Sequence, residues 1–295
     1  MPSQLRIHGA LFTVAFLFSA NYIFAKLAMR EFAPLAFAWL RIGGAALILS
    51  VFMRGGEPLS REDARRVTGF AVLGVAINAT LFIAGLALTT VQTAAVLITA
   101  IPVFAAGAAI VLGHEAASAQ RLGGIALAGA GALLAVGGEG FTGSWRSVAG
   151  AGMIILNCLS YALYLVISKP VMARLPAKRV VARMFAIGAV LLLPVCAWSL
   201  WHQEWNRVSP RAWIVLLLSI LGPTVLAYLL NAWALRYADS SLVAAYTYVQ
   251  PVLAAALGAV FLGEPIRVVA IVAAAMIFSG VWLAGRANVK APILE

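Results

Sequence analysis

Charge is scarce in this sequence. Of its 295 residues, 11% are Asp, Glu, Lys or Arg, and ten residues in all are acidic. A water-soluble domain carries about 25% charged residues, because its surface has to be solvated. The apolar share is correspondingly large, at 63%, with a mean hydropathy of +0.99. These proportions exclude an ordinary soluble domain and indicate that lipid is the main solvent.

Residue types that build metal centres and disulfide frameworks are also few. The two cysteines, Cys158 and Cys196, each lie inside an apolar run, and the three histidines lie in loops or near the ends of runs. Neither pattern has metal-ligand or disulfide spacing, so we expect no metal, no cofactor and two buried, inert thiols. None of the acidic residues lies in the middle of an apolar run, which argues against a membrane enzyme. No filter or ring motif typical of a channel occurs either.

Long apolar runs are what the sequence has in abundance. A membrane span needs about 20 mostly apolar residues to cross about 30 Å of hydrocarbon. Residues 67–113 carry no charge; as a single helix they would extend about 70 Å, so the chain has to fold back, near Thr89–Gln92. We therefore predict an all-α membrane protein with ten spans: Gly9–Met29, Pro34–Met53, Val67–Leu88, Thr93–Gly113, Leu122–Gly138, Ser147–Ser168, Met184–Trp201, Ala212–Leu235, Ser240–Gly263 and Val268–Gly285.

The net charge of +11 indicates membrane topology and not a nucleic-acid partner. The basic residues form short clusters between apolar runs, without the basic face and interleaved aromatic residues typical of nucleic-acid binding. Fourteen of the 21 fall on the side that carries both termini, five fall on the opposite side, and Lys26 and Arg41 lie inside spans. Cytoplasmic loops are enriched in Lys and Arg. Both termini are therefore predicted to be cytoplasmic.

The two halves of the chain resemble each other. Each has a Pro, a Glu 13 residues later and a Gly 16 residues after the Glu, at Pro102, Glu115 and Gly131 and again at Pro251, Glu264 and Gly280. Earlier in each half a Lys ends the first span and an Arg enters the second, at Lys26 and Arg41 and at Lys169 and Arg183. Two copies of five spans, residues 1–146 and 147–295, have to insert in opposite orientations because five is odd. Such inverted repeats are typical of secondary transporters that work by alternating access, with the substrate site near the midplane between the halves. A repeat kept for packing alone is the alternative.

Together with Ala20-Asn-Tyr-Ile-Phe-Ala-Lys26 and Pro34, these motifs make the whole chain resemble the drug/metabolite transporter superfamily, in particular its ten-helix EamA-type exporters. The resemblance implies export of aromatic and other neutral amino acids and related metabolites, through a central cavity lined by spans 1, 3, 4, 6, 8 and 9. We accordingly expect a multi-pass protein of the inner (plasma) membrane, a monomer or weak homo-oligomer, whose partners are small metabolites and lipid. An exporter of cationic drugs or other small metabolites is the alternative.

Uncharged polar and aromatic side chains near the middle of spans are the candidate substrate ligands. A buried amide or hydroxyl without a partner is costly in hydrocarbon, so each is expected to face a neighbouring helix or a water-filled cavity. Asn157, Tyr161 and Tyr164 share one helix face at spacings of four and three, which favours a cavity. The full set is Asn21, Tyr22, Asn78, Thr99, Asn157, Tyr161, Tyr164, Tyr228, Asn231, Tyr246, Tyr248 and Gln250. Packing between helices is the alternative role for each.

Two basic residues and two prolines complete the predicted site. Lys26 lies near the outer end of the first span, where it could contact substrate, reach the interface or pair structurally. Arg41 lies deeper and is expected to be structural, paired with a helix C-terminus or backbone carbonyls. Pro102 and Pro251 kink spans 4 and 9 and free the carbonyls four residues earlier. Those carbonyls could hold a substrate ammonium, or the kinks could serve the shape of the helix alone.

Overall fold

The computed structural model describes residues 3–53, 59–112, 119–140, 144–238, 243–244, 246–263 and 268–285. Within these ranges the chain forms helices and no strand. The elements are α1 (Gln4–Ala28), α2 (Pro34–Leu49), η1 (Ser50–Met53), α3 (Arg61–Ala71), η2 (Val72–Ile77), α4 (Asn78–Leu88), α5 (Val91–Ile98), α6 (Ile101–Val111), α7 (Ala119–Gly140), α8 (Trp145–Arg174), α9 (Ala177–Trp201), η3 (Trp205–Arg207), α10 (Pro210–Ser219), η4 (Ile220–Leu226), α11 (Ala227–Tyr237), η5 (Tyr246–Tyr248), α13 (Val249–Leu262) and α14 (Val268–Gly285).

Seven helical stretches are long and apolar enough to cross a membrane: Gln4–Ala28, Pro34–Met53, Arg61–Leu88, Thr93–Val111, Trp145–Arg174, Ala177–Trp201 and Pro210–Tyr237. Three shorter apolar stretches, Leu122–Gly131, Tyr246–Leu262 and Ile271–Gly280, lie within the predicted fifth, ninth and tenth spans. The part of the chain that the structure describes is therefore that of an all-helical, multi-pass membrane protein. The count of ten spans and their orientation stay predictions.

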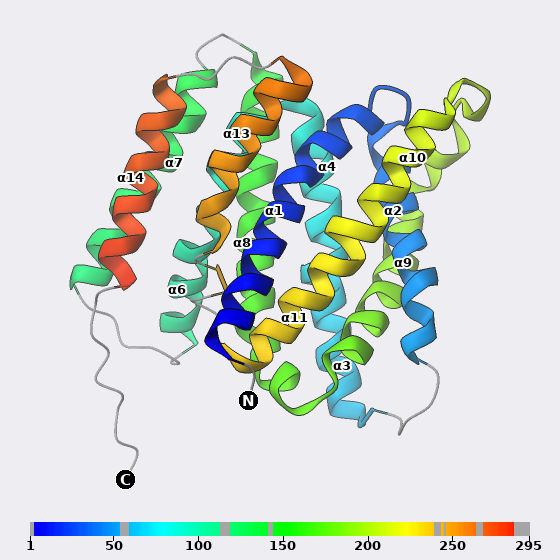
Figure 1. Ribbon diagram of the computed structural model, residues 1–295, viewed down its shortest axis with the longest axis horizontal. Coiled ribbons are helices and arrows are strands. Elements are labelled where there is room, and N and C mark those ends of the chain that lie inside the picture. Colours follow the sequence, from blue (N-terminus) through cyan, green and yellow to red (C-terminus); the bar gives the residue numbers. More distant parts are fainter. Residues whose placement is uncertain are drawn as a thin grey trace.

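The helices stand side by side in one bundle (Figure 1). The α7 and α14 helices pair along their lengths at one end of the bundle, and α2 pairs with α9 at the other. Between them α1 contacts α13, α10 and α11, while α8 contacts α4, α5 and α6. Large apolar side chains such as Val190 and Val260 remain 71% and 76% exposed on the outside. In lipid such exposure carries no penalty, so packing has to come from close helix contact.

Helix starts follow from local sequence signals. Ser60, Thr90 and Ser209 precede α3, α5 and α10, and the hydroxyl of each accepts a hydrogen bond from the backbone N–H three residues later. This cap satisfies one of the N–H groups that a helix start leaves without a partner. Pro34 and Pro210 stand in the first turn of α2 and α10, where a missing N–H costs nothing.

The helices α4 and α8 approach each other closely through glycine. A Cβ atom at Gly85 would lie 2.8 Å from the carbonyl oxygen of Gly150, and a Cβ at Gly150 would lie 2.8 Å from the carbonyl oxygen of Gly85. Two backbones can come this near only without side chains at the contact. The approach sets the position of α8 against α4, and hence of the polar residues that both helices carry further along.

Two of the long helical rods contain a π-helical segment at their middle. η2 joins α3 to α4, and η4 joins α10 to α11. A π-helical turn shifts the backbone hydrogen bonds by one residue and can leave a carbonyl for another donor. In η2 the Leu73 carbonyl accepts from the Ser160 hydroxyl at 2.8 Å, and the Gly74 carbonyl accepts from the Tyr228 hydroxyl at 3.0 Å. Both donors come from helices of the second half of the chain.

Helical structure is also interrupted near the two prolines of the sequence motif. Between α5 and α6 the N–H groups of Thr99 and Ala100 bond to carbonyls three residues back, and Pro102 follows in the first turn of α6. The second interruption is the 3₁₀ turn η5, which directly precedes α13 with its third residue Pro251. Both interruptions lie deep in the bundle.

Candidate functional site

A cavity lies at the middle of the bundle, where α1, α2, α4, α8 and η4 meet the interrupted helices. It encloses about 590 Å³ of atom-free space, counted out to its opening. Small-molecule sites occur preferentially in such spaces between the helices of a bundle. The segments that the resemblance implied all contribute to its wall, and α2 contributes as well, through Arg41 and Ile42.

Uncharged polar groups dominate one part of the wall. The Asn157 side-chain amide donates to the backbone carbonyl of Asn78 at 2.9 Å, which ties α8 to α4. The Tyr228 hydroxyl donates to the Asn78 side-chain oxygen at 3.3 Å as well as to the η2 carbonyl. The Tyr22 hydroxyl lies 3.4 Å from the side-chain oxygen of Gln250. These groups bond one another across helices, as buried polar groups in lipid have to.

Aromatic rings form the apolar part of the wall. Phe18 meets the rings of Tyr161 and Tyr228 edge-on, with centroids 6.4 and 6.0 Å away. Tyr22 and Phe82 form a similar pair at 5.4 Å. Such rings present flat apolar surface beside hydroxyl groups, which suits a ligand that has both an apolar and a polar end.

Arg41 is the one charged side chain among the described residues that line the cavity. Its Nη1 donates to the side-chain oxygen of Asn21 at 2.9 Å, and its guanidinium lies 6.0 Å from the centre of the Phe37 ring. The expectation of a helix C-terminus or backbone carbonyls as its partner was wrong. Because α1 and α2 run antiparallel, the chain brings Asn21 opposite Arg41. The side-chain oxygen of Asn21 is therefore the hydrogen-bond acceptor for Arg41.

Comparison with known proteins identifies the family. The model of the EamA-like transporter family matches residues 6–137 and, a second time, residues 148–286. The chain belongs to this family. It is 28% identical over 255 residues to an uncharacterized transporter of Archaeoglobus fulgidus, which covers 85% of this chain and 87% of that relative. A second uncharacterized transporter of the same organism is 25% identical over 280 residues, covering 85% and 98%.

A protein of known crystal structure shares the fold of this EamA-like transporter. The two superpose with a TM-score of 0.67 over 96% of this chain and 97% of the other, at 21% sequence identity. This likeness supports the arrangement of the helices and carries no information on the substrate. Family membership, the transporter relatives and the apolar helices together identify the protein as a multi-pass membrane transporter.

The structure gathers seven of the predicted substrate ligands of the transporter on the cavity wall: Asn21, Tyr22, Asn78, Asn157, Tyr161, Tyr228 and Gln250. Two more, Asn231 and Tyr246, line a smaller adjoining pocket. Asn231 donates to the Tyr161 hydroxyl at 2.9 Å, and the hydroxyl of Tyr246 lies 2.6 Å from the His8 ring. Gln250 lines both spaces, so the pockets adjoin along α13.

The other predicted ligands lie away from the cavity wall. Lys26 donates to the Thr89 carbonyl at 2.6 Å, at the end of α4. Tyr164 packs over Gly74, where a Cβ would lie 2.8 Å from its ring. The Thr99 hydroxyl bonds within its own helix, to the Val96 carbonyl. Tyr248 lies against the ring of Phe278. Substrate contact by these four residues, Lys26, Tyr164, Thr99 and Tyr248, stays a prediction.

Sequence reasoning missed part of the wall. The missed apolar members are Phe18, Ile42, Phe82, Ile101 and Pro223, and the missed polar member is Thr224. The wall also contains Ile98 and Thr247, whose carbonyls the two prolines were expected to free. In a lipid-facing helix an apolar residue carries no sign of whether it meets lipid, another helix or a cavity. Thr224 could have been found, because it is a polar residue beside a proline near the middle of a predicted span.

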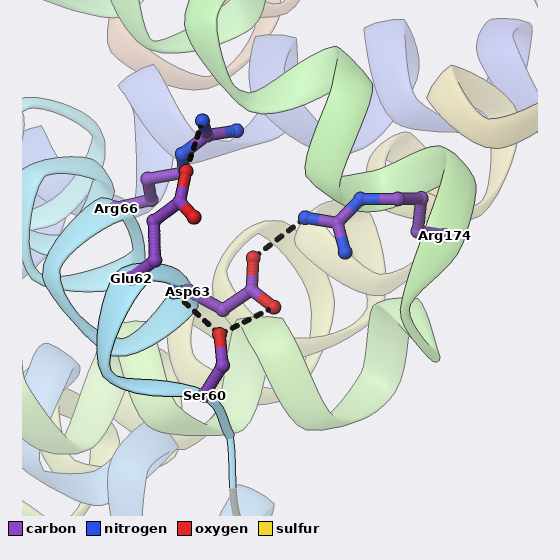
Figure 2. Close-up of polar contacts among 5 residues, drawn as sticks. All are labelled: Ser60, Glu62, Asp63, Arg66 and Arg174. Carbon is purple, nitrogen blue, oxygen red and sulfur yellow. Dashed lines mark hydrogen bonds and ion pairs between the residues drawn. The ribbon is translucent and has the colours of Figure 1, made fainter.

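An ion pair outside the predicted third and sixth spans, which begin at Val67 and end at Ser168 respectively, joins the two halves at one end of the bundle. Figure 2 shows Arg174, at the end of α8, reaching Asp63 in the first turn of α3 at 2.6 Å. The Ser60 hydroxyl also bonds the Asp63 carboxylate at 3.0 Å. The hydrogen bond from Arg174 is the main cause that lowers the pKa of Asp63 below its ordinary value, helped by Ser60. The pair links the ends of α3 and α8, and neither residue lines the cavity.

Proposed function

We propose that this transporter exports neutral amino acids, aromatic ones among them, and related metabolites across the inner (plasma) membrane by alternating access. The observation that carries the proposal is the chemistry of the central cavity. Its described wall combines amides, hydroxyls and aromatic rings with a single cation and has no carboxylate. A substrate with an apolar side chain and a polar end fits such a wall.

The ends of a zwitterionic amino acid find suitable partners in this wall. Pro102 and Pro251 have no N–H to donate to the carbonyls of Ile98 and Thr247, and both of these residues line the cavity. Such carbonyls suit an ammonium group, and the amide donors suit a carboxylate. The aromatic rings suit an apolar side chain. The alternative, export of hydrophobic cations, fits less well, because an unpaired cation in a cavity without carboxylates costs several kcal/mol.

Inverted five-helix halves, residues 1–146 and 147–295, are part of the proposal. In support, the family model matches the chain twice. The π-helical segments η2 and η4 end at Ile77 and Leu226, 25 residues before Pro102 and Pro251 respectively. The helices after them, α4 and α11, end at Leu88 and Tyr237, 14 residues before the same prolines.

The lysines of the repeat motif add a further correspondence. Lys26 donates to the Thr89 carbonyl at 2.6 Å, and Lys169 donates to the Ala238 carbonyl at 3.4 Å. Each lysine thus reaches the carbonyl of the residue directly after the equivalent helix of its own half, where a positive charge is favourable. The same lysine-to-carbonyl hydrogen bond, formed by equivalent residues in each half, supports two similar halves. Two similar halves can in turn give two similar states that are open to opposite sides of the membrane.

Alternating access requires contacts between the halves that can open. The contact of α1 with α13 joins the halves and includes the interrupted region of the second one. Apart from apolar packing, the described residues form three polar links between α1 and the η5–α13 segment: His8 with Tyr246 at 2.6 Å, the Ser19 hydroxyl with the Gln250 carbonyl at 3.4 Å, and Tyr22 with the Gln250 side chain at 3.4 Å. Two of these three donor–acceptor distances are long, so hydrogen bonds hold this contact between the halves weakly. A weakly held contact can open during alternating access.

Uptake by the purified transporter in proteoliposomes tests the proposal. Radiolabelled phenylalanine, tryptophan and leucine should enter vesicles that contain the transporter faster than they enter protein-free vesicles. Unlabelled neutral amino acids should compete with this uptake. Hydrophobic cations such as tetraphenylphosphonium serve as the other arm. Transport of the cations without transport of any amino acid would establish the alternative and refute the proposal.

A further inference from the structure

Arg41 lies far from either end of its helix and next to the cavity. It is the eighth of the sixteen residues of α2, and only 6% of its surface is exposed. No ion pair that the described residues form includes it. A guanidinium stays protonated in proteins. A full positive charge therefore lies beside the cavity without a described carboxylate to balance it.

Arg41 makes few of the hydrogen bonds that its guanidinium group could donate. A guanidinium has five N–H donors, and the described side chains and backbone supply one acceptor, the Asn21 side-chain oxygen at 2.9 Å. The Nε atom is buried and has no partner. The Phe37 ring adds a neutral, weakly attractive face. Arg41 thus has only neutral partners, although its planar fork matches a carboxylate.

Asn21 is held in an orientation that adds a donor to the same place. Its side-chain oxygen accepts from Arg41 and also from the Ser219 hydroxyl at 3.3 Å. The Arg41 donor identifies this atom as the oxygen, because a reversed amide would set an N–H group against the guanidinium N–H. The Nδ2 group is then the free end of the amide, with no hydrogen bond to any described residue. Asn21 also lines the cavity.

A purely structural role does not explain the charge. To tie α1 to α2, a neutral hydrogen-bond donor to the same oxygen of Asn21 would be enough. A buried charge is costlier than a neutral amide unless an opposite charge accompanies it. The positive charge would stabilise an anion in the cavity. Packing of α1 against α2 does not need that charge.

We propose that Arg41, with Asn21 beside it, binds the carboxylate of the substrate, so that the cavity selects monocarboxylates and rejects the corresponding amides and amines. This inference rests on the proposed function and names the group by which the amino acid is recognised. The carboxylate neutralises the guanidinium and accepts from the Asn21 amide, while the substrate's remaining groups meet the carbonyls and rings described above. After the substrate leaves, the positive charge of Arg41 is again unbalanced, which favours binding of another carboxylate.

Matched ligands test the proposal on the unaltered transporter. Phenylalanine and leucine are compared with phenylalaninamide and leucinamide, which keep the side chain and ammonium and lack the carboxylate. A charge-assisted bond is expected to favour each acid by about 10- to 100-fold in competition against labelled phenylalanine. The carboxylate 3-phenylpropionate should compete and 2-phenylethylamine should not. Equal potency of acids and amides would overturn the role of Arg41 and leave amino-acid export standing. Failure of both acids and amides to bind would overturn the proposed function and this inference with it.

Two variants locate the preference at Arg41. Asn21→Asp is isosteric and supplies Arg41 with a permanent carboxylate, so it should fold; we expect acid binding to fall by at least about 10-fold and amide binding to be kept or improved. Ser219→Ala removes the other bond to the same oxygen of Asn21 without altering charge, and should keep the acid preference of the unaltered protein. Arg41→Gln, if it folds, should bind acid and amide equally. An unchanged acid preference in Asn21→Asp would contradict the proposal even if Arg41→Gln does not fold.

Discussion

A methyl group added at Gly150 should disturb both the fold and the site, whereas the same group two residues later should not. In Gly150→Ala the new Cβ would lie 2.8 Å from the Gly85 carbonyl oxygen and 2.8 Å from the Leu88 Cβ. Neither atom is the end of a flexible side chain, so α4 and α8 have to move apart. At Gly152 a Cβ meets nothing within 4 Å, which makes Gly152→Ala the matched control on the same helix.

The expected difference follows from two opposing effects. Forcing an extra methyl into a close-packed contact costs typically about 1–3 kcal/mol, while alanine gains up to about 1 kcal/mol over glycine in a helix interior. Gly152→Ala has only the gain. The two variants should therefore differ by about 1–3 kcal/mol in the free energy of unfolding, with Gly150→Ala the less stable.

Unfolding in mixed micelles with increasing dodecyl sulfate, followed by tryptophan fluorescence, measures this difference. A functional readout accompanies it. Asn157 stands two helical turns after Gly150 and bonds the Asn78 carbonyl of α4, so separating the helices should also lower amino-acid uptake in Gly150→Ala and leave it unchanged in Gly152→Ala. Equal stability and equal uptake of the two variants would show that the α4–α8 contact is looser than described.

Three further predictions concern the rest of the molecule. Ser160→Ala leaves a π-helical carbonyl without its donor and should lower stability by about 0.5–2 kcal/mol in the same assay, with Ser160→Thr as the milder change. Because Arg174 lowers the pKa of Asp63, the pair stabilises the fold fully above the ordinary value of about 3.8 and loses that effect as pH falls through the lower folded value. The melting-temperature difference between the unaltered protein and Asp63→Asn should thus be constant at neutral pH and shrink only in strong acid; shrinkage already near neutrality would exclude the pair as its source. Reporter fusions after Gly56 and after Glu139 should report opposite sides of the membrane, and a common side would show that the span count is wrong.

Most of the fold could be predicted from the sequence, because apolar runs in lipid leave little choice but helices. The π-helical segments could not. Their shifted hydrogen bonds depend on donors far away in the chain, such as Ser160 and Tyr228. The closeness of α4 and α8 was also hidden, since Gly85 and Gly150 look like any other glycines of an apolar sequence.

The polar half of the site was easier to predict than the apolar half. An amide or phenol in an apolar run draws attention because it needs a partner, and Asn21, Asn78 and Asn157 were found in this way. Helix-face spacing was less informative. Tyr164 shares a face with Asn157, but it lies about 10 Å further along the helix, where it packs on Gly74. Spacing gives the direction of a side chain and not the depth at which a cavity ends.

We propose that amino acids pass through this cavity without a titrating carboxylate. Among the described wall residues there is no Asp or Glu to carry a coupled proton. The most direct test is the flux of labelled phenylalanine in proteoliposomes, down its own gradient, with and without an imposed pH gradient. We expect flux in both conditions at similar rates. Flux that strictly requires the pH gradient, and that is abolished by replacing one acidic residue, would contradict it.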